Sequence, residues 1–141
     1  MIRYILDTNA VSDFIDRQEP LYSRVLAEGV AVGTTVITLD ESLTGWYNLI
    51  RKAKKPDRVV WAYDRLGRAT VQLAKLPILP FPLSAYHLSD QLRGMKLNVG
   101  SDDLRIAAIA PDAQMTVVTA NVRDFARVPG LLVEDWTQPV A

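Results

Sequence analysis

Residues 4–9 read Tyr-Ile-Leu-Asp-Thr-Asn, and this short stretch decides how the whole chain is interpreted. Its first half is an apolar run typical of a buried strand. The run passes directly into the carboxylate of Asp7, although an unpaired charge in an apolar interior is very costly. Thr8 or Asn9 can cap a helix expected over about residues 9–17. The stretch therefore predicts a strand, a sharp polar turn and a helix.

The rest of the chain continues this alternation of strands and helices. Strands are expected near residues 30–36 and 115–119, with short extended pieces at 77–80 and 131–133. Helical patterns cover 20–28, 38–53, 57–76, 84–97 and 102–110, and Pro111 should end or kink the last of these. Alternation of this kind predicts an α/β fold, with a parallel central sheet flanked by helices as an α/β/α sandwich. Ligands of such sheets bind at the carboxyl ends of the strands, where Asp7 falls.

Composition narrows the possible functions. The chain has 141 residues, 49% of them hydrophobic, so a single domain spanning residues 1–141 is expected. The formal net charge is +0, cysteine is absent and His87 is the one histidine. Disulfides, thiolate chemistry and a histidine-rich metal site are therefore excluded. The sequence shows no secretion signal and no apolar run of membrane-spanning length, so we expect a soluble cytoplasmic protein without membrane contact.

Four acids stand where strands end or helices begin, namely Asp7, Glu41, Asp103 and Asp124. Each taken alone has a simpler interpretation as a helix cap or a first-turn acid favoured by the helix dipole. As a set, they could converge on one cleft of the sheet. Converging carboxylates raise one another's pKa, and a hard divalent cation relieves their repulsion. Oxygen ligands without histidine or cysteine suit Mg²⁺ or Mn²⁺.

These acids lie in motifs that resemble the PIN domain, and within it the ribonuclease toxins of the VapC type. The matching segments are Leu6-Asp7-Thr8-Asn9, residues 37–41 with Gly45, residues 103–108, residues 118–125, and residues 128–131 followed by Glu134-Asp135-Trp136. The resemblance implies a PIN-like fold and a catalytic, metal-binding cluster of Asp7, Glu41 and Asp103, with Asp124 as the fourth acid. It also implies supporting roles for Thr119, Asn121 and Asn9. Asp40 and Asp102 adjoin two of these acids, but motif spacing and helix geometry select Glu41 and Asp103.

The resemblance further implies a Mg²⁺- or Mn²⁺-dependent endoribonuclease that hydrolyses RNA phosphodiester bonds. It implies a toxin restrained by a cognate antitoxin protein, often as a toxin homodimer. For holding RNA, the sequence offers the basic residues Arg51, Lys52, Lys54 and Lys55. Their alternative interpretation is a solvated helix end, where cations are favoured by the helix dipole.

Two other functions remain open at this point. A catalytically silent PIN-type RNA-binding or interaction protein would be expected to lose acids, and all four are present. An α/β phosphatase with Asp7 as the nucleophile is the second alternative. Such enzymes commonly carry another aspartate two residues later, where this chain has Asn9.

Overall fold

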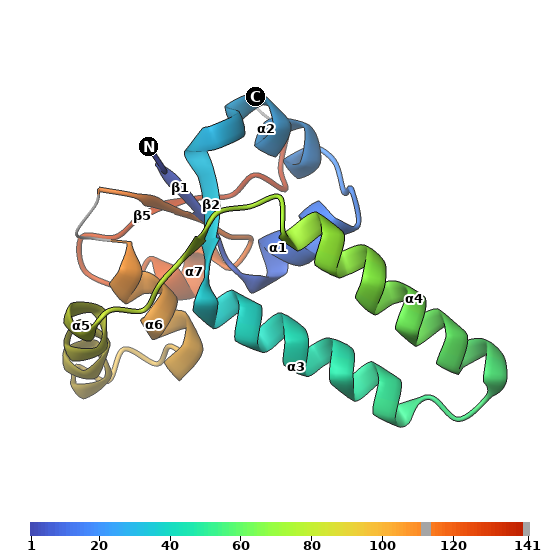
Figure 1. The fold of residues 1–141 in the computed structure, drawn as a ribbon. Coiled ribbons are helices and arrows are strands. Elements are labelled where there is room, and N and C mark those ends of the chain that lie inside the picture. Colours follow the sequence, from blue (N-terminus) through green and yellow to red (C-terminus); the bar gives the residue numbers. More distant parts are fainter. Residues whose placement is uncertain (111–113, 140–141) are drawn as a thin grey trace.

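A computed structural model of the chain describes residues 1–110 and 114–139. At its centre is a five-stranded sheet in the order β3-β2-β1-β4-β5, in which every neighbouring pair is parallel (Figure 1). The strands are β1 (Tyr4–Leu6), β2 (Val32–Thr35), β3 (Ile78–Leu79), β4 (Thr116–Val118) and β5 (Leu132–Glu134). The predicted α/β fold with a parallel sheet is confirmed.

Helices connect the strands and cover the sheet on both faces (Figure 1). They are α1 (Thr8–Ile15), α2 (Leu21–Glu28), the 3₁₀ turn η1 (Gly29–Ala31), α3 (Val36–Lys52), α4 (Pro56–Leu73), α5 (Leu83–Gly94), α6 (Ser101–Ile109) and α7 (Val122–Phe125). The central strand is β1, and its parallel pairing with β4 places the residues following Leu6 and Val118 side by side. This edge is where the polar motifs of the sequence meet.

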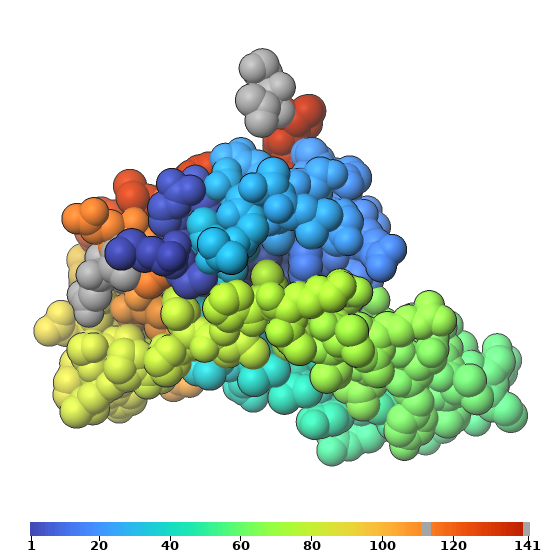
Figure 2. Space-filling view, turned by 45° about the horizontal axis from the view of Figure 1, so that its top comes forward, coloured from blue at the N-terminus to red at the C-terminus, as the bar shows by residue number. Residues whose placement is uncertain are grey.

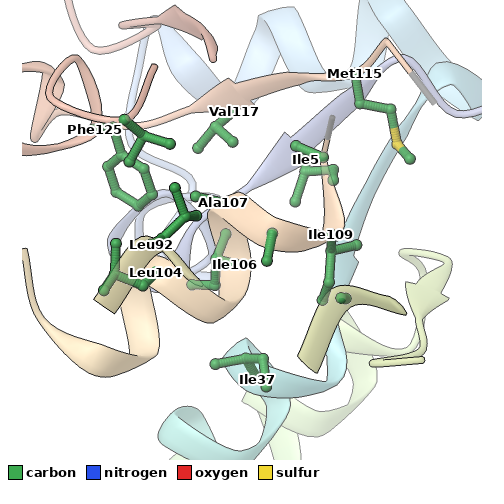
Figure 3. Packing of buried hydrophobic residues seen from close by; sticks show 14 residues of the cluster. Ile5, Ile37, Leu92, Leu104, Ile106, Ala107, Ile109, Met115, Val117 and Phe125 are labelled. Carbon is green, nitrogen blue, oxygen red and sulfur yellow. The ribbon is translucent and has the colours of Figure 1, made fainter. Parts of the chain in front are cut away.

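The first core lies between the sheet and helices α5 and α6. Ile5 of β1 pairs in register with Val117 of β4, and both side chains are fully buried against α6. Figure 3 shows these two side chains directed toward Ala107 and its neighbours on that helix. Because side chains alternate along a strand, Ile5 and Leu6 must belong to opposite faces of the sheet.

The second core, on the opposite face, contains Leu6 and Val118 together with side chains of α1, α2 and α4. Trp136, which follows β5, is almost fully buried in it and packs edge-on against Tyr4 at a centroid separation of 4.8 Å. Apolar burial on both faces explains why the strands read as continuous apolar runs. It also fixes the strand end rigidly just before Asp7.

Helices α3 and α4 form a hairpin that projects away from the sheet (Figure 1). In the space-filling view the hairpin extends well beyond the body of the molecule (Figure 2). Its turn carries the basic residues Lys54 and Lys55, and both are exposed. The sequence predicts the two helices but contains no signal for this projection, because the angle between them is set by packing near their other ends.

Several boundaries differ from those predicted. The strand expected over 30–36 is shorter, because η1 precedes it and Val36 already begins α3 behind a Thr35 cap. Gly33 within β2 is required by a close approach, since a Cβ there would lie 2.9 Å from the carbonyl oxygen of Pro77. Helix α6 ends at Ile109, and Pro111 lies outside the described residues. Within the described ranges, no helix is long and apolar enough to cross a membrane.

Candidate active site

Asp7 lies at the carboxyl end of β1 and is only 3% exposed. Its backbone N–H donates to the carbonyl of Val118 at 3.1 Å, so the residue still belongs to the parallel pairing. Its Oδ1 accepts from the backbone N–H of Ala10 at 2.8 Å, which makes Asp7 the N-cap of α1. The prediction that Thr8 or Asn9 caps this helix is wrong. Asp7 has the extended backbone of a cap, and an aspartate there satisfies a backbone donor of the first turn.

Thr119, directly after β4, holds the other oxygen of this carboxylate. Its Oγ1 donates to Oδ2 of Asp7 at 2.5 Å and accepts from the backbone N–H of Asn121 at 2.9 Å. Its own N–H donates to the carbonyl of Glu134 at 2.9 Å. The buried Thr119 hydroxyl thus connects the ends of β1 and β4, and both oxygens of Asp7 have a fixed direction.

Glu41 reaches the site from the second turn of α3, the helix that follows β2. Its Oε1 accepts from the hydroxyl of Thr8 at 2.6 Å, and that hydroxyl lies 3.2 Å from the hydroxyl of Thr38. Thr8 therefore joins α1 to α3 beside the acids. The sequence predicts only a capping role for Thr8. Its position directly after Asp7 is the one sequence signal that points to a role beside the acids.

Asp103 and Asp124 come from α6 and α7. Asp103 lies in the first turn of α6 and is partly buried. Asp124 accepts from Asn121 Nδ2 at 3.0 Å and forms an ion pair with Arg127 at 3.2 Å. Asp124 thus has a local amide and a local cation as partners, in contrast to the other three acids.

Burial is the main influence on the three inner acids. It raises the pKa of Asp7, Glu41 and Asp103 above their ordinary values, and the hydrogen bonds from Thr119 and Thr8 counteract it in part. Neighbouring carboxylates raise the pKa values further: Glu41 acts on Asp7, Asp7 acts on Asp103, and Asp103 acts on Glu41. The three acids therefore share one electrostatic environment.

Asp102 enters the same environment. Its charge raises the pKa of Glu41 more than the charge of Asp103 does, and it also acts on Asp103. From sequence, helix geometry selects Asp103 over Asp102, because adjacent helix residues point in different directions. At the first turn of α6, however, both acids are close enough to α3 to act on Glu41.

The donor set suits a hard divalent cation. All the possible ligand atoms are oxygens. Burial and mutual repulsion disfavour the charged form of the carboxylates, and a bound cation would offset both effects. Among the residues that the structure describes, no three acidic or histidine side chains stand close enough to ligate one ion together. Mg²⁺ commonly uses one or two carboxylates and keeps several waters, so the set fits such an ion.

The remaining predicted residues lie farther out. Asn9 is exposed on α1 and lines a pocket that also contains Glu41. Arg51 and Lys52 lie at the far end of α3. With a rise of 1.5 Å per helical residue, Arg51 is about 15 Å from Glu41 along the helix axis. The structure therefore does not bring the basic cluster to the acids.

The fold is that of a known family. The pattern of the PIN domain matches residues 4–131, and the chain belongs to the PIN domain family.

Two relatives match nearly the whole chain. "Ribonuclease VapC2" of Rickettsia felis is 29% identical over 140 residues, which is 94% of this chain and 97% of the relative. "tRNA(fMet)-specific endonuclease VapC" of Salmonella typhimurium is 27% identical over 141 residues, 96% of this chain and 99% of the relative. The chain is thus similar over its length to proteins named as VapC ribonucleases.

Solved structures give the same result. The DNA-bound VapBC of Salmonella typhimurium superimposes with a TM-score of 0.79 at 28% identity, covering 96% of this chain and 99% of the other. VapBC2 of Rickettsia felis, bound to a DNA fragment from its promoter, gives 0.78 at 26% identity with coverage of 96% and 99%. Both of these structures are VapBC complexes bound to DNA.

Proposed function

We propose that this protein is a divalent-metal-dependent endoribonuclease that hydrolyses RNA phosphodiester bonds, with Asp7, Glu41 and Asp103 as its central residues. One observation supports this proposal above the others. Acids from three separate elements share one environment at the carboxyl ends of β1 and β4, where burial and mutual repulsion raise their pKa values. Such an arrangement is unfavourable for stability, which is typical of a site retained for chemistry.

The chain's own residues have distinct parts in this proposal. Asp7 is the fixed ligand, because the Ala10 N–H and the Thr119 hydroxyl determine the direction of both its oxygens. Glu41 is held through one oxygen by Thr8, which leaves the other for an ion or a water molecule. Mg²⁺ or Mn²⁺, when bound, would neutralise the phosphodiester and activate water for attack.

Asp103 of α6 and Asp124 of α7 complete the set of acids. Within residues 1–110 and 114–139, the Asp103 carboxylate has no side-chain hydrogen bond or ion pair, and the charges of Asp7 and Asp124 raise its pKa. Asp124 is paired with Arg127 and Asn121. In this proposal it is the outermost acid and orients the part of the RNA that binds beyond Asp103. Asn121 thereby links the Thr119 hydroxyl to Asp124.

We further propose that the protein is the toxin of a toxin–antitoxin pair. This rests on the similarity to VapC ribonucleases and to structures of VapBC complexes over at least 94% of the chain. A cognate antitoxin would then bind this chain and restrain its activity. Growth arrest on induction, relieved by the antitoxin, is the expected behaviour in cells.

The test of the activity is cleavage of bulk cellular RNA by the purified chain. We expect cleavage with Mg²⁺ or Mn²⁺ and none with EDTA. We also expect none from Asp103→Asn, which removes a charge and keeps the side-chain volume. Cleavage that persists in EDTA would contradict the metal dependence, and full activity of Asp103→Asn would contradict the site.

A further inference from the structure

A pocket beside Glu41 is lined by residues of α1, α3 and α4. Figure 1 shows how these three helices are arranged. Its volume is about 270 Å³, and Glu41 forms part of its wall. The α1 side contributes the amide of Asn9 and the hydroxyl of Ser12, and α3 contributes the hydroxyl of Ser42. These neutral groups can each donate and accept hydrogen bonds, which is the capability needed to read a base edge or a ribose hydroxyl.

The apolar part of the pocket comes from the buried Ile15 and Trp46 and from the exposed Leu49. Gly45 of α3 also lines the pocket and is exposed. A Cβ at this position would meet no atom within 4 Å. Glycine in a helix interior lowers helix stability. Neither backbone crowding nor a positive φ requires it here, so its effect is to keep the pocket open.

Arg65 of α4 supplies the one cation of the pocket lining. It is held in place by a short ion pair with Asp16, at the end of α1. A guanidinium carries five N–H donors, so this pair leaves others for a second anion. Arg65 therefore offers a fixed phosphate contact on the side of the pocket away from the acids.

We propose that this pocket binds one nucleotide of single-stranded RNA next to the bond that is cut, with Arg65 on its phosphate. The inference rests on the proposed ribonuclease function and names the substrate contact of that same site. Its volume lies just below the range of pockets for drug-sized ligands, about 300–1,000 Å³, as expected for a single nucleotide. The combination of hydroxyls, an amide, an apolar floor and one guanidinium matches a nucleotide better than an apolar side chain.

Filling the pocket tests the proposal. Gly45→Leu places a side chain into it from an open position, and Gly67→Leu is the matched control. Gly67 also lies within a helix, is exposed and has open space at its Cβ, but it does not line this pocket. Gly45→Ala adds a methyl group and should raise the melting temperature, which reports on folding.

The readout is the affinity for a short fluorescein-labelled RNA of random sequence, measured by anisotropy in EDTA so that no cleavage occurs. We expect Gly45→Leu to weaken binding by at least about tenfold, and Gly67→Leu to bind as the wild type does. Calorimetric titration with Mn²⁺ should give the same affinity for all variants, because the acids are untouched.

Salt dependence tests Arg65 separately. Arg65→Gln should lower the slope of log affinity against log salt by about 0.7, the value for one phosphate of a single strand. Arg68→Gln is the control, because Arg68 pairs with Asp64 on the exposed side of the same helix and does not line this pocket. It should leave the slope unchanged.

The outcomes separate the two proposals. If the wild type neither binds nor cuts RNA, the ribonuclease function fails and this inference fails with it. If the wild type cuts RNA and Gly45→Leu binds RNA equally well, only the nucleotide pocket is refuted. Loss of antitoxin inhibition in Gly45→Leu with unchanged RNA affinity would also refute it, and would assign the pocket to the protein partner.

Discussion

Asp7→Asn should stabilise the metal-free protein, whereas Asp7→Ala should destabilise it. The carboxylate of Asp7 is buried, and burial raises its pKa despite two hydrogen bonds to it. Asparagine removes the buried charge and remains one of the best N-cap residues. Its amide N–H can donate to the Thr119 hydroxyl oxygen, which keeps a hydrogen bond between the two side chains with its direction reversed.

Alanine loses both interactions. Loss of the cap to Ala10 costs about 1 kcal/mol. The buried Thr119 hydroxyl then lacks its acceptor, at a cost of about 1–3 kcal/mol. The free energies of unfolding of the two variants should therefore differ by about 2–4 kcal/mol. For a slope near 2 kcal/mol/M, a difference of about 2 kcal/mol moves the urea midpoint by about 1 M.

The assay is urea unfolding in EDTA at about pH 7.5 and about pH 5. The wild-type acid has a raised pKa in the folded state, so the folded protein binds more protons and its stability falls as pH rises. The advantage of Asp7→Asn should therefore shrink toward the lower pH. If Asp7→Asn were less stable than the wild type at the higher pH, the reasoning on the buried charge would be refuted.

Three further results are expected. The metal-free wild type should unfold at lower urea concentrations as pH rises through the ordinary carboxyl pKa and above, because the pKa values of Asp7, Glu41 and Asp103 are all raised in the folded state. A urea midpoint that does not change with pH would contradict this prediction. Thr119→Val should lower the Mn²⁺ affinity measured by calorimetry about 10–100-fold, because Asp7 loses the hydrogen bond that orients it. An unchanged affinity would show that Thr119 contributes only to packing. Asp103→Asn should abolish RNA cleavage and Asp102→Asn should only reduce it, so equal losses would make Asp102 a central residue as well.

Much of the fold follows from local patterns. Short apolar runs such as residues 4–6 are typical of strands in a sheet that is buried on both faces. The polar residues after Leu6 mark the end of that strand. Parallel order then brings the ends of β1 and β4 together, which unites Asp7 and Thr119 although 112 positions separate them in sequence. The resemblance of the motifs selected the same residues.

Other features depend on distances that the sequence does not contain. Asp102 was excluded on helix direction, but its influence on Glu41 depends on how closely α6 approaches α3. The sequence offers the basic residues near Lys54 for holding RNA but does not give their distance from the acids, which the projection of the α3–α4 hairpin makes large (Figure 1). The Thr8–Glu41 hydrogen bond is a further case, because both residues are ordinary in sequence and meet only through packing.

The most direct test of the central claim is a map of RNA 5′ ends in bacterial cells after induction of the wild type and of Asp7→Asn. The urea unfolding experiment described above is the test that Asp7→Asn is folded and can serve as the control. We predict new 5′ ends with the wild type alone, at a restricted set of sites. Identical end profiles, with both proteins present in soluble form, would contradict the claim that the acids around Asp7 form a ribonuclease centre.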